Sequence, residues 1–163
     1  MIGTVARSAF YELLALPLAF TRVRTRLRVP RLLLREPVGA HDISLRRCLI
    51  QSVLSGGVGL LGWFLAMLSV LVLVRGFAYP LVAADSYQTS WGGPTLAGAW
   101  LVHAVSGALI APAFVAVIAL CGRLQLRVTR TVLGGDRSWW AIPVALVLVA
   151  AGGLFFVAWV RQI

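Results

Sequence analysis

The stretch WGGPTLAGAWLVHAVSGALIAPAFVAVIALC, residues 91–121, decides the fold of this chain. Trp91 is a residue type that gathers at membrane interfaces, and Gly92-Gly93-Pro94 predicts a turn with proline placed to begin a helix. The run that follows, residues 95–121, contains no Asp, Glu, Lys or Arg and exceeds the roughly 20 residues that a spanning helix needs. We therefore predict a membrane span at about 95–121 that starts at an aqueous interface.

Two more apolar runs flank this one, at 48–74 and 139–160. The first is bounded by arginines on both sides, and the second opens with the interfacial pair Trp139-Trp140. The whole chain is 60% hydrophobic and 12% charged, which excludes an ordinary water-soluble domain. The sequence thus predicts an all-α integral membrane protein with three transmembrane helices.

An N-terminal segment, residues 1–47, precedes the transmembrane domain, residues 48–163. Its apolar part, residues 9–20, is too short to span and contains Glu12 and Pro17, so it is expected to be interfacial or shallowly re-entrant. Residues 21–36 alternate arginine with aliphatic residues, as in a helix lying on anionic lipid, and Pro30 is expected to break that helix. The predicted headgroup contacts of the chain are Arg22, Arg24, Arg26, Arg28, Arg31, Arg35, Arg127 and Arg130.

The arginines also predict the topology. Nine of the 15 precede the first span, one lies in the loop 75–94, four lie in the loop 122–138, and one follows the last span. Arginine-rich segments stay cytoplasmic. We expect a multi-pass protein of the plasma membrane with a cytoplasmic N-terminus, an outer loop at 75–94, an inner basic loop at 122–138 and an extracytoplasmic C-terminus.

An ionisable residue inside a span is a candidate functional residue, and His103 is the one in the middle span. Three interpretations are open: a neutral imidazole bonded to a neighbouring helix, a pH- or ligand-responsive position, or a haem or metal ligand. The last lacks a partner, because the other histidine, His41, falls near the far end of a helix. The candidate contacts for a ligand or partner are His103, Trp91, Trp100, Tyr87 and Asp85.

Small residues at a spacing of four allow two helices to approach closely. Ser52 with Gly56 and Ser55 with Gly59 have this spacing in the first span. Glycine as mere tolerated filler is the alternative. The predicted helix-packing positions are Ser52, Gly56, Gly59, Gly98 and Gly107.

Enzymatic chemistry is not expected. The chain has five acidic residues, two histidines and no lysine, and no set of nucleophile, base and orienting group can be assembled from them. The two cysteines, Cys48 and Cys121, are interpreted as small apolar residues, because they lie at the ends of spans on the predicted cytoplasmic side, where disulfides are rare.

No nucleic acid is expected as a partner. The arginines flank long apolar runs and do not lie among aromatic residues that could stack on bases. We also expect no cofactor and no metal.

Three segments resemble a known family. FYELLALPL at 10–18, WGGPTLAGAWLVH at 91–103 and RLQLRVTRTVLG at 123–134 resemble the membrane sensor domain found in actinobacteria at the N-terminus of two-component histidine kinases. The resemblance covers about residues 8–135 and implies a sensor-type membrane module. Kinase activity does not carry over, because here Asp136 leads into another span. The pair of spans expected after the LPL segment is also incomplete.

Two functions follow as expectations. The first is a non-catalytic, sensor-like integral membrane protein that relays or docks through its helices. The alternative is an accessory or scaffolding subunit of a larger membrane complex, such as a transporter or respiratory assembly. A third hypothesis, which rests on His103 and the tryptophans, is a redox subunit that contacts haem or quinone. The expected partners are a bilayer with anionic headgroups and other membrane protein subunits, in a homo- or hetero-oligomer.

Overall fold

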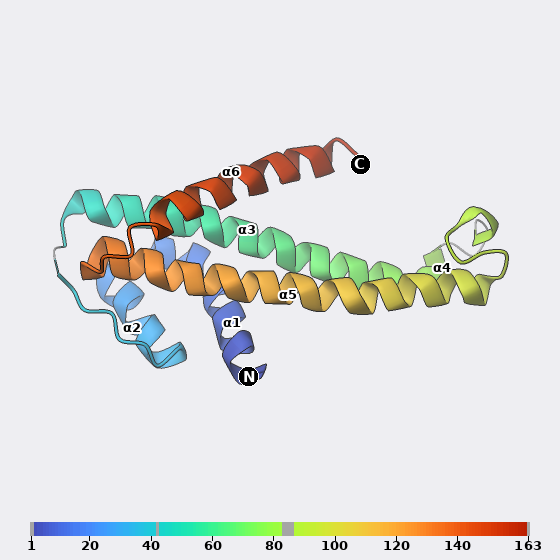
Figure 1. The fold of residues 1–163 in the computed structure, drawn as a ribbon, viewed down its shortest axis with the longest axis horizontal. Coiled ribbons are helices and arrows are strands. Elements are labelled where there is room, and N and C mark those ends of the chain that lie inside the picture. Colours follow the sequence, from blue (N-terminus) through green and yellow to red (C-terminus); the bar gives the residue numbers. More distant parts are fainter. Residues whose placement is uncertain (1, 42, 83–86, 163) are drawn as a thin grey trace. The chain divides into compact units, whose positions relative to one another are not determined.

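The structure is a computed structural model that describes residues 2–41, 43–82 and 87–162. Its described residues form helices and turns with no strand among them, which confirms the all-α class. Asp85, one of the candidate contacts, lies outside the described residues. In chain order the elements are α1 (Ile2–Ala19), α2 (Val23–Leu33), α3 (Leu45–Phe77), α4 (Tyr79–Val82), the 3-10 helix η1 (Tyr87–Thr89), α5 (Leu96–Gly134) and α6 (Ala141–Val160) (Figure 1).

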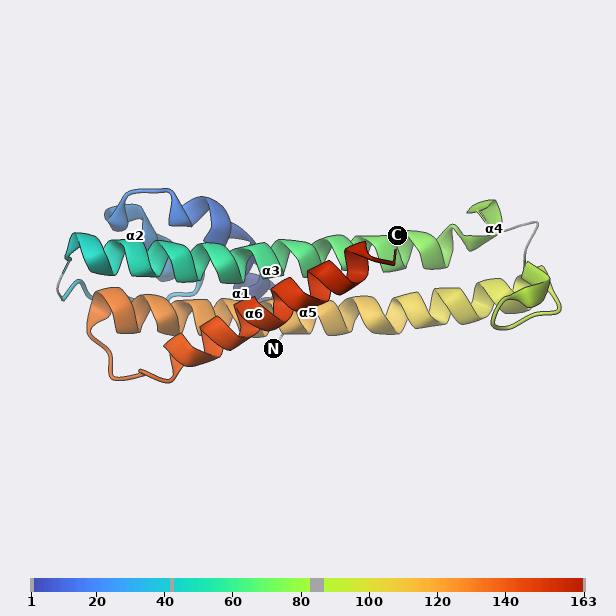
Figure 2. The ribbon, with the colours of Figure 1, turned by 90° about the horizontal axis from the view of Figure 1, so that it is seen from above.

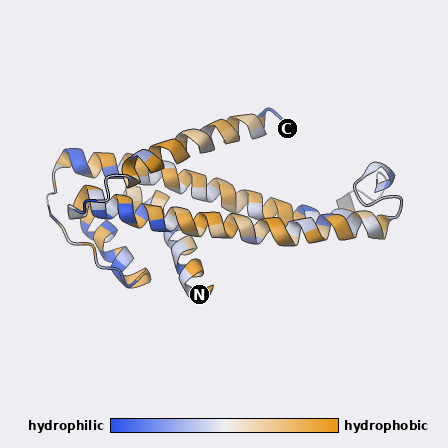
Figure 3. Cartoon of the chain, in the orientation of Figure 1, coloured by the Kyte–Doolittle hydropathy of each residue, from blue (hydrophilic) through white to orange (hydrophobic). Residues whose placement is uncertain are grey.

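Three of the described helices, α3, α5 and α6, are long and apolar enough to cross a membrane. Figure 3 shows α6 coloured as hydrophobic along almost its whole length. This confirms the three predicted membrane-spanning helices. The inner basic loop predicted at 122–138 is helical up to Gly134, where α5 ends, as the resemblance of residues 123–134 to an arginine-rich amphipathic helix implies. The helix continues because Leu124 and Val128 lie one turn apart on a buried face, while Arg123 and Arg127 point outward.

The described chain divides into two compact units, the first comprising residues up to 64 and from 118 onward, the second comprising 65–117. In the first unit, α6 lies against the middle of α3: a Cβ at Gly57 would meet Val149, and a Cβ at Gly152 would meet Leu61 (Figure 2). Phe64 of α3 makes edge-to-face ring contacts with Phe155, Phe156 and Trp159 of α6. The buried apolar core of this unit comprises Leu54, Val58, Cys121, Leu124, Val128, Val132, Leu133, Ala141 and Ala145.

The helix α1 was predicted to be interfacial or re-entrant, and it is not one of the three span candidates. One face of it is nevertheless buried in the first unit. That face lies on glycines: a Cβ at Gly59 would meet the backbone of Leu16, and a Cβ at Gly62 would meet the side chain of Glu12. Hydrogen at these positions allows α1 to approach the backbone of the spans directly.

The helix α2 passes through Pro30, where a break was predicted, and ends at Leu33. Pro30 is buried, so burial of its ring offsets the backbone bond that proline cannot donate. The carbonyl of Pro30 then accepts bonds from the N–H groups of Leu34 and Glu36. Between those two residues, Arg35 has a φ of 60°, a left-handed conformation that reverses the chain after the helix.

In the second unit, the end of α3 and the start of α5 approach closely at two glycines. A Cβ at Gly76 would meet the carbonyl oxygen of His103 at 2.8 Å, and a Cβ at Gly107 would meet the carbonyl oxygen of Val72 at 3.0 Å. Both glycines are buried. The second unit is thus a close pair of helices with α4 and η1 in the connection between them.

Candidate functional site

A buried polar network in the first unit is centred on Arg26. This residue was predicted to contact lipid headgroups, which the structure contradicts, since Arg26 is 8% exposed. Its position on α2 points the side chain into the unit, where protein oxygens satisfy the guanidinium instead of lipid phosphate. Burial of arginine is tolerated only when its donors are bonded in this way.

The guanidinium of Arg26 joins three elements of the first unit. It donates to the last turn of α1 and the connection after it, and to the first two turns of α3. On α3 the amide of Gln51 in turn donates to the hydroxyl of Ser55 at 2.6 Å. The acceptors of Arg26 are the carbonyl oxygens of Ala19 (2.7 Å), Thr21 (3.0 Å) and Cys48 (3.3 Å), Gln51 Oε1 (2.7 Å) and Ser52 Oγ (2.6 Å).

Glu12 is a second buried charged-type residue, with no exposed surface. Neither carboxyl oxygen has a hydrogen-bond partner among the described residues. Its Cγ lies 2.8 Å from the position a Cβ would take at Gly62, a residue in the middle of the apolar run 48–74. Burial raises the pKa of Glu12 to about 8, because water no longer solvates the carboxylate. At neutral pH this side chain is therefore mainly a neutral acid.

Polar groups of α5 lie on the same side of the first unit. Tyr11 of α1 and Thr129 of α5 are both buried, and the hydroxyl of Thr129 donates to the carbonyl of Gln125 at 2.9 Å. The side-chain oxygen of Gln125 is buried and, like those of Glu12, without a partner in the described part of the chain. The α1–α5 interface thus holds unsatisfied acceptors, which a protonated carboxyl tolerates better than a carboxylate.

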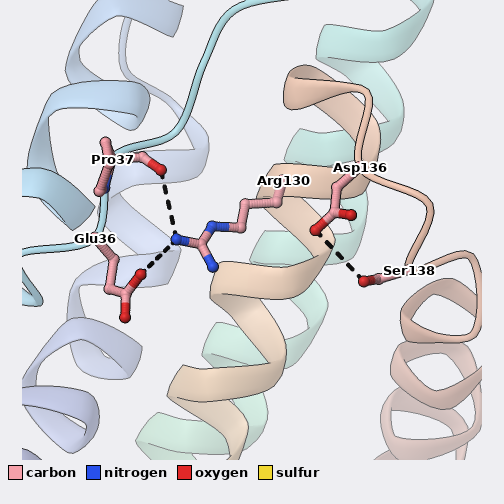
Figure 4. Close-up of polar contacts among 5 residues, drawn as sticks. All are labelled: Glu36, Pro37, Arg130, Asp136 and Ser138. Carbon is pink, nitrogen blue, oxygen red and sulfur yellow. Dashed lines mark hydrogen bonds and ion pairs between the residues drawn. The ribbon is translucent and has the colours of Figure 1, made fainter.

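Two more arginines predicted to contact headgroups also make protein contacts. Arg130 forms an ion pair with Glu36 at 2.5 Å and donates to the carbonyl of Pro37 at 3.4 Å (Figure 4). Arg127 lies over the ring of Trp140, 5.3 Å from its centroid. Both side chains can reach these partners because α5 stays helical past residue 122. The remaining predicted headgroup arginines, Arg22, Arg24, Arg28, Arg31 and Arg35, are exposed.

The loop that follows α5 carries further polar contacts. The hydroxyl of Ser138 donates to a carboxylate oxygen of Asp136 at 3.4 Å, one turn of chain before α6 begins (Figure 4). Both groups are at least partly exposed. In the same connection the hydroxyl of Thr131 donates to the carbonyl of Ser138 at 3.2 Å, and the N–H of Asp136 donates to the carbonyl of Arg130 at 3.1 Å.

In the second unit, His103 stacks on Tyr79, with ring centroids 4.1 Å apart. Its Nδ1 donates to the carbonyl oxygen of Ala99, one turn earlier in its own helix, at 2.8 Å. The neighbour of the imidazole is therefore the aromatic ring of α4, and its hydrogen bond stays within α5. The Tyr79 hydroxyl donates to Ser90 at 2.6 Å, which ties α4 to the segment after η1.

The candidate contacts of the second unit do not all come together. The indole N–H of Trp100 donates to the carbonyl of Phe77 at 3.2 Å, so Trp100 and His103 both contact residues 77–79. Trp91 is 84% exposed, and Tyr87 is half-buried in η1. Sequence reasoning missed Tyr79 as a site residue, although an aromatic residue just beyond Arg75 is the expected interfacial type.

The predicted helix-packing residues have different neighbours. Gly56 and Gly59 face α1, and Gly107 faces α3. Gly98 does not face a second helix: a Cβ there would meet the carbonyl oxygen of Gly92, in the turn before α5. Ser52 acts through its hydroxyl, which accepts from Arg26 and donates to the carbonyl of Cys48.

Besides Tyr79, the sequence analysis did not assign Glu12 to a site, and it assigned Arg26 to the wrong partner. A single acid in an otherwise apolar segment was the available signal for Glu12. For Arg26 no such signal existed, because it is one of four arginines in α2. No group of three or more His, Cys, Asp or Glu side chains that could hold a metal occurs in residues 2–41, 43–82 and 87–162.

Comparison of the chain with protein-family models, with curated proteins and with solved structures finds no match.

Proposed function

We propose that this protein is a non-catalytic, sensor-like membrane protein in which α1 and α2 relay a change in the spans to the cytoplasmic side. The observation that supports this most is the bonding of Arg26 to α1, to α3 and to the connection between α1 and α2. A shift of the first turns of α3 would change the acceptors of Arg26. Because α2 carries this side chain, it would have to move with α3 or lose buried hydrogen bonds.

The orientation of the chain in the membrane is part of the same proposal. We place the N-terminus in the cytoplasm and the C-terminus outside the plasma membrane, on the distribution of the 15 arginines. The aromatic contacts of His103 and Trp100 then face the outside, where a signal or partner would arrive. The resemblance to the actinobacterial sensor domain implies a sensor-type membrane module at most.

The relay is testable with a spin label at Leu32, which is 68% exposed on α2. Cys48 and Cys121 are first replaced by alanine, and the full chain is reconstituted in nanodiscs. We expect His103→Ala, which removes the stack on Tyr79, to change the mobility of the label. An unchanged signal at Leu32 in a folded His103→Ala protein would refute the relay.

A second function, an accessory subunit of a larger membrane complex, is favoured by α6. The most apolar window of α6 is 11% buried, against 33% for α3 and 28% for α5. Leu146, Val147 and Leu154 lie among its exposed residues. Mild-detergent purification from native membranes, followed by mass measurement, separates the two functions. A stoichiometric second polypeptide supports the subunit; the bare chain or a homo-oligomer supports the sensor.

A further inference from the structure

The first unit contains a basic groove between α2 and the segment after it. Its volume is about 300 Å³. Four of its lining residues are spaced on α2 as i, i+3, i+4 and i+7, which places them on one face of the helix. The groove is lined by Arg24, Leu27, Arg28, Arg31, Pro37 and Val38.

The second wall of the groove is held in place by α5. Arg130 pairs with Glu36 and donates to the carbonyl of Pro37, and the N–H of His41 donates to the carbonyl of Leu133 at 3.1 Å. The left-handed φ of Arg35 turns the chain back toward α2 so that this wall can form. The groove is therefore a built feature of the first unit, with both walls anchored.

The charge in the groove is uncompensated by the described residues. Arg24, Arg28 and Arg31 are exposed, and none of them has an ion pair within the described part of the chain. The nearest acid in the sequence, Glu36, is held by Arg130. Arg26, the remaining arginine of α2, points into the unit and leaves the other three on the groove side.

Three guanidinium groups on one face are suited to a phosphate group, because each presents a planar fork of N–H donors to phosphate oxygens. The rest of the lining, Leu27, Pro37 and Val38, is apolar. A ligand that combines a phosphate with hydrocarbon matches both parts. We propose that this groove binds the phosphate headgroup of an anionic phospholipid, with the apolar residues against its glycerol and first acyl carbons.

Of the eight arginines predicted to contact lipid headgroups, the inference assigns three to one specific site. It rests on the proposed function, in which α2 lies at the cytoplasmic membrane surface. The test uses the full chain in mild detergent with dioctanoyl-phosphatidylglycerol as the probe, measured by thermophoresis or native mass spectrometry. The groove variant is Arg24→Gln/Arg28→Gln/Arg31→Gln. Its matched control, Arg46→Gln/Arg123→Gln/Arg137→Gln, removes the same charge from exposed arginines outside the groove.

We expect the groove variant to weaken lipid binding about tenfold or more, and the control to change it about twofold or less. Equal losses in both variants would overturn the proposal, because they would show a general charge effect. Single Arg28→Gln and Arg46→Gln variants repeat the comparison if the triple variant fails to fold. They should show the same order with a smaller difference, and equal binding would count against the groove.

A competition experiment distinguishes a lipid headgroup from free phosphate as the ligand of the groove. Inorganic phosphate at millimolar concentration should displace little of the lipid, since it cannot use the apolar wall. Complete displacement would refute a lipid headgroup and indicate a site for free phosphate. The response of the Leu32 label to His103→Ala does not depend on this ligand, so failure of the groove and failure of the relay are distinguishable.

Discussion

Arg26 and Gln51 form a buried side-chain hydrogen bond of 2.7 Å that joins α2 to α3. The bond is charge-assisted, and the Gln51 amide passes the network on to Ser55. Only neutral oxygens among the described residues accept from Arg26, so the positive charge is balanced by dipoles instead of a carboxylate. Such an arrangement depends on exact positions of α1, α2 and α3, which makes it sensitive to their movement.

Replacing Arg26 should therefore loosen the first unit. Arg26→Met keeps much of the side-chain length but removes every donor, leaving the carbonyls of Ala19 and Thr21 without their bonds. We expect a loss of about 2–4 kcal/mol in the free energy of unfolding, measured as a lower Tm in detergent. Arg28→Met, at an exposed position of the same helix, should change it by less than about 0.5 kcal/mol.

Glu12 predicts the pH dependence of stability. Its pKa is raised from 4.5 to about 8 on folding, so the folded chain holds a proton that the unfolded chain releases. Stability should be highest below pH 4.5, fall as pH rises from 4.5 to 8, and stay low above that. The full effect is on the order of 5 kcal/mol. Among the described residues, Tyr11 and Cys121 are titratable groups close enough to interact electrostatically with Glu12.

Glu12→Gln removes this titration while keeping the shape of the side chain. Its Tm should be nearly independent of pH between 5 and 9, and above pH 8 it should exceed that of the unsubstituted chain. Thermal unfolding at stepped pH provides the measurement. A wild-type curve that is flat over this range, or that rises with pH, would be inconsistent with a buried neutral acid.

Gly122 tests the contact between α1 and α5. A Cβ at this position would collide with the carbonyl oxygen of Ser8, which is backbone and cannot move away alone. Gly122→Ala should therefore separate α1 from α5 and cost about 1–3 kcal/mol. Gly153→Ala is the matched control on a helix, because nothing lies within 4 Å of its Cβ position. It should be neutral or stabilise the chain by up to about 1 kcal/mol.

Topology gives a prediction independent of packing. Alkaline phosphatase fused after residue 163 should be active, because that enzyme works only outside the cytoplasm. A fusion at Asp136, in the short connection before α6, should be inactive. The reverse pattern would place the arginine-rich segments outside and would contradict the orientation drawn from the sequence.

The sequence was informative wherever hydrophobicity decides the structure. Runs of more than 20 apolar residues identify α3, α5 and α6, because in lipid the backbone must satisfy its own hydrogen bonds. The site was harder to predict. Arg26 and Arg28 look alike in the sequence, and only the rotation of α2 against α3 makes one buried and the other exposed.

The same limit applies to the glycines. Gly56 and Gly59 were predicted to pack against another helix, but periodicity does not say which one. The structure places α1 there, a helix too short and too interrupted by Glu12 and Pro17 to be predicted as part of the bundle. Burial of Glu12 is a consequence of that tertiary contact and has no local cause.

The relay through Arg26 is tested most directly by combining two substitutions. The label at Leu32 is measured in four chains: unsubstituted, His103→Ala, Arg26→Met and the double variant. If Arg26 carries the coupling, His103→Ala changes the label signal in the unsubstituted background and has no additional effect once Arg26 is methionine. An equal change in both backgrounds would show that the signal bypasses Arg26 and would contradict this account.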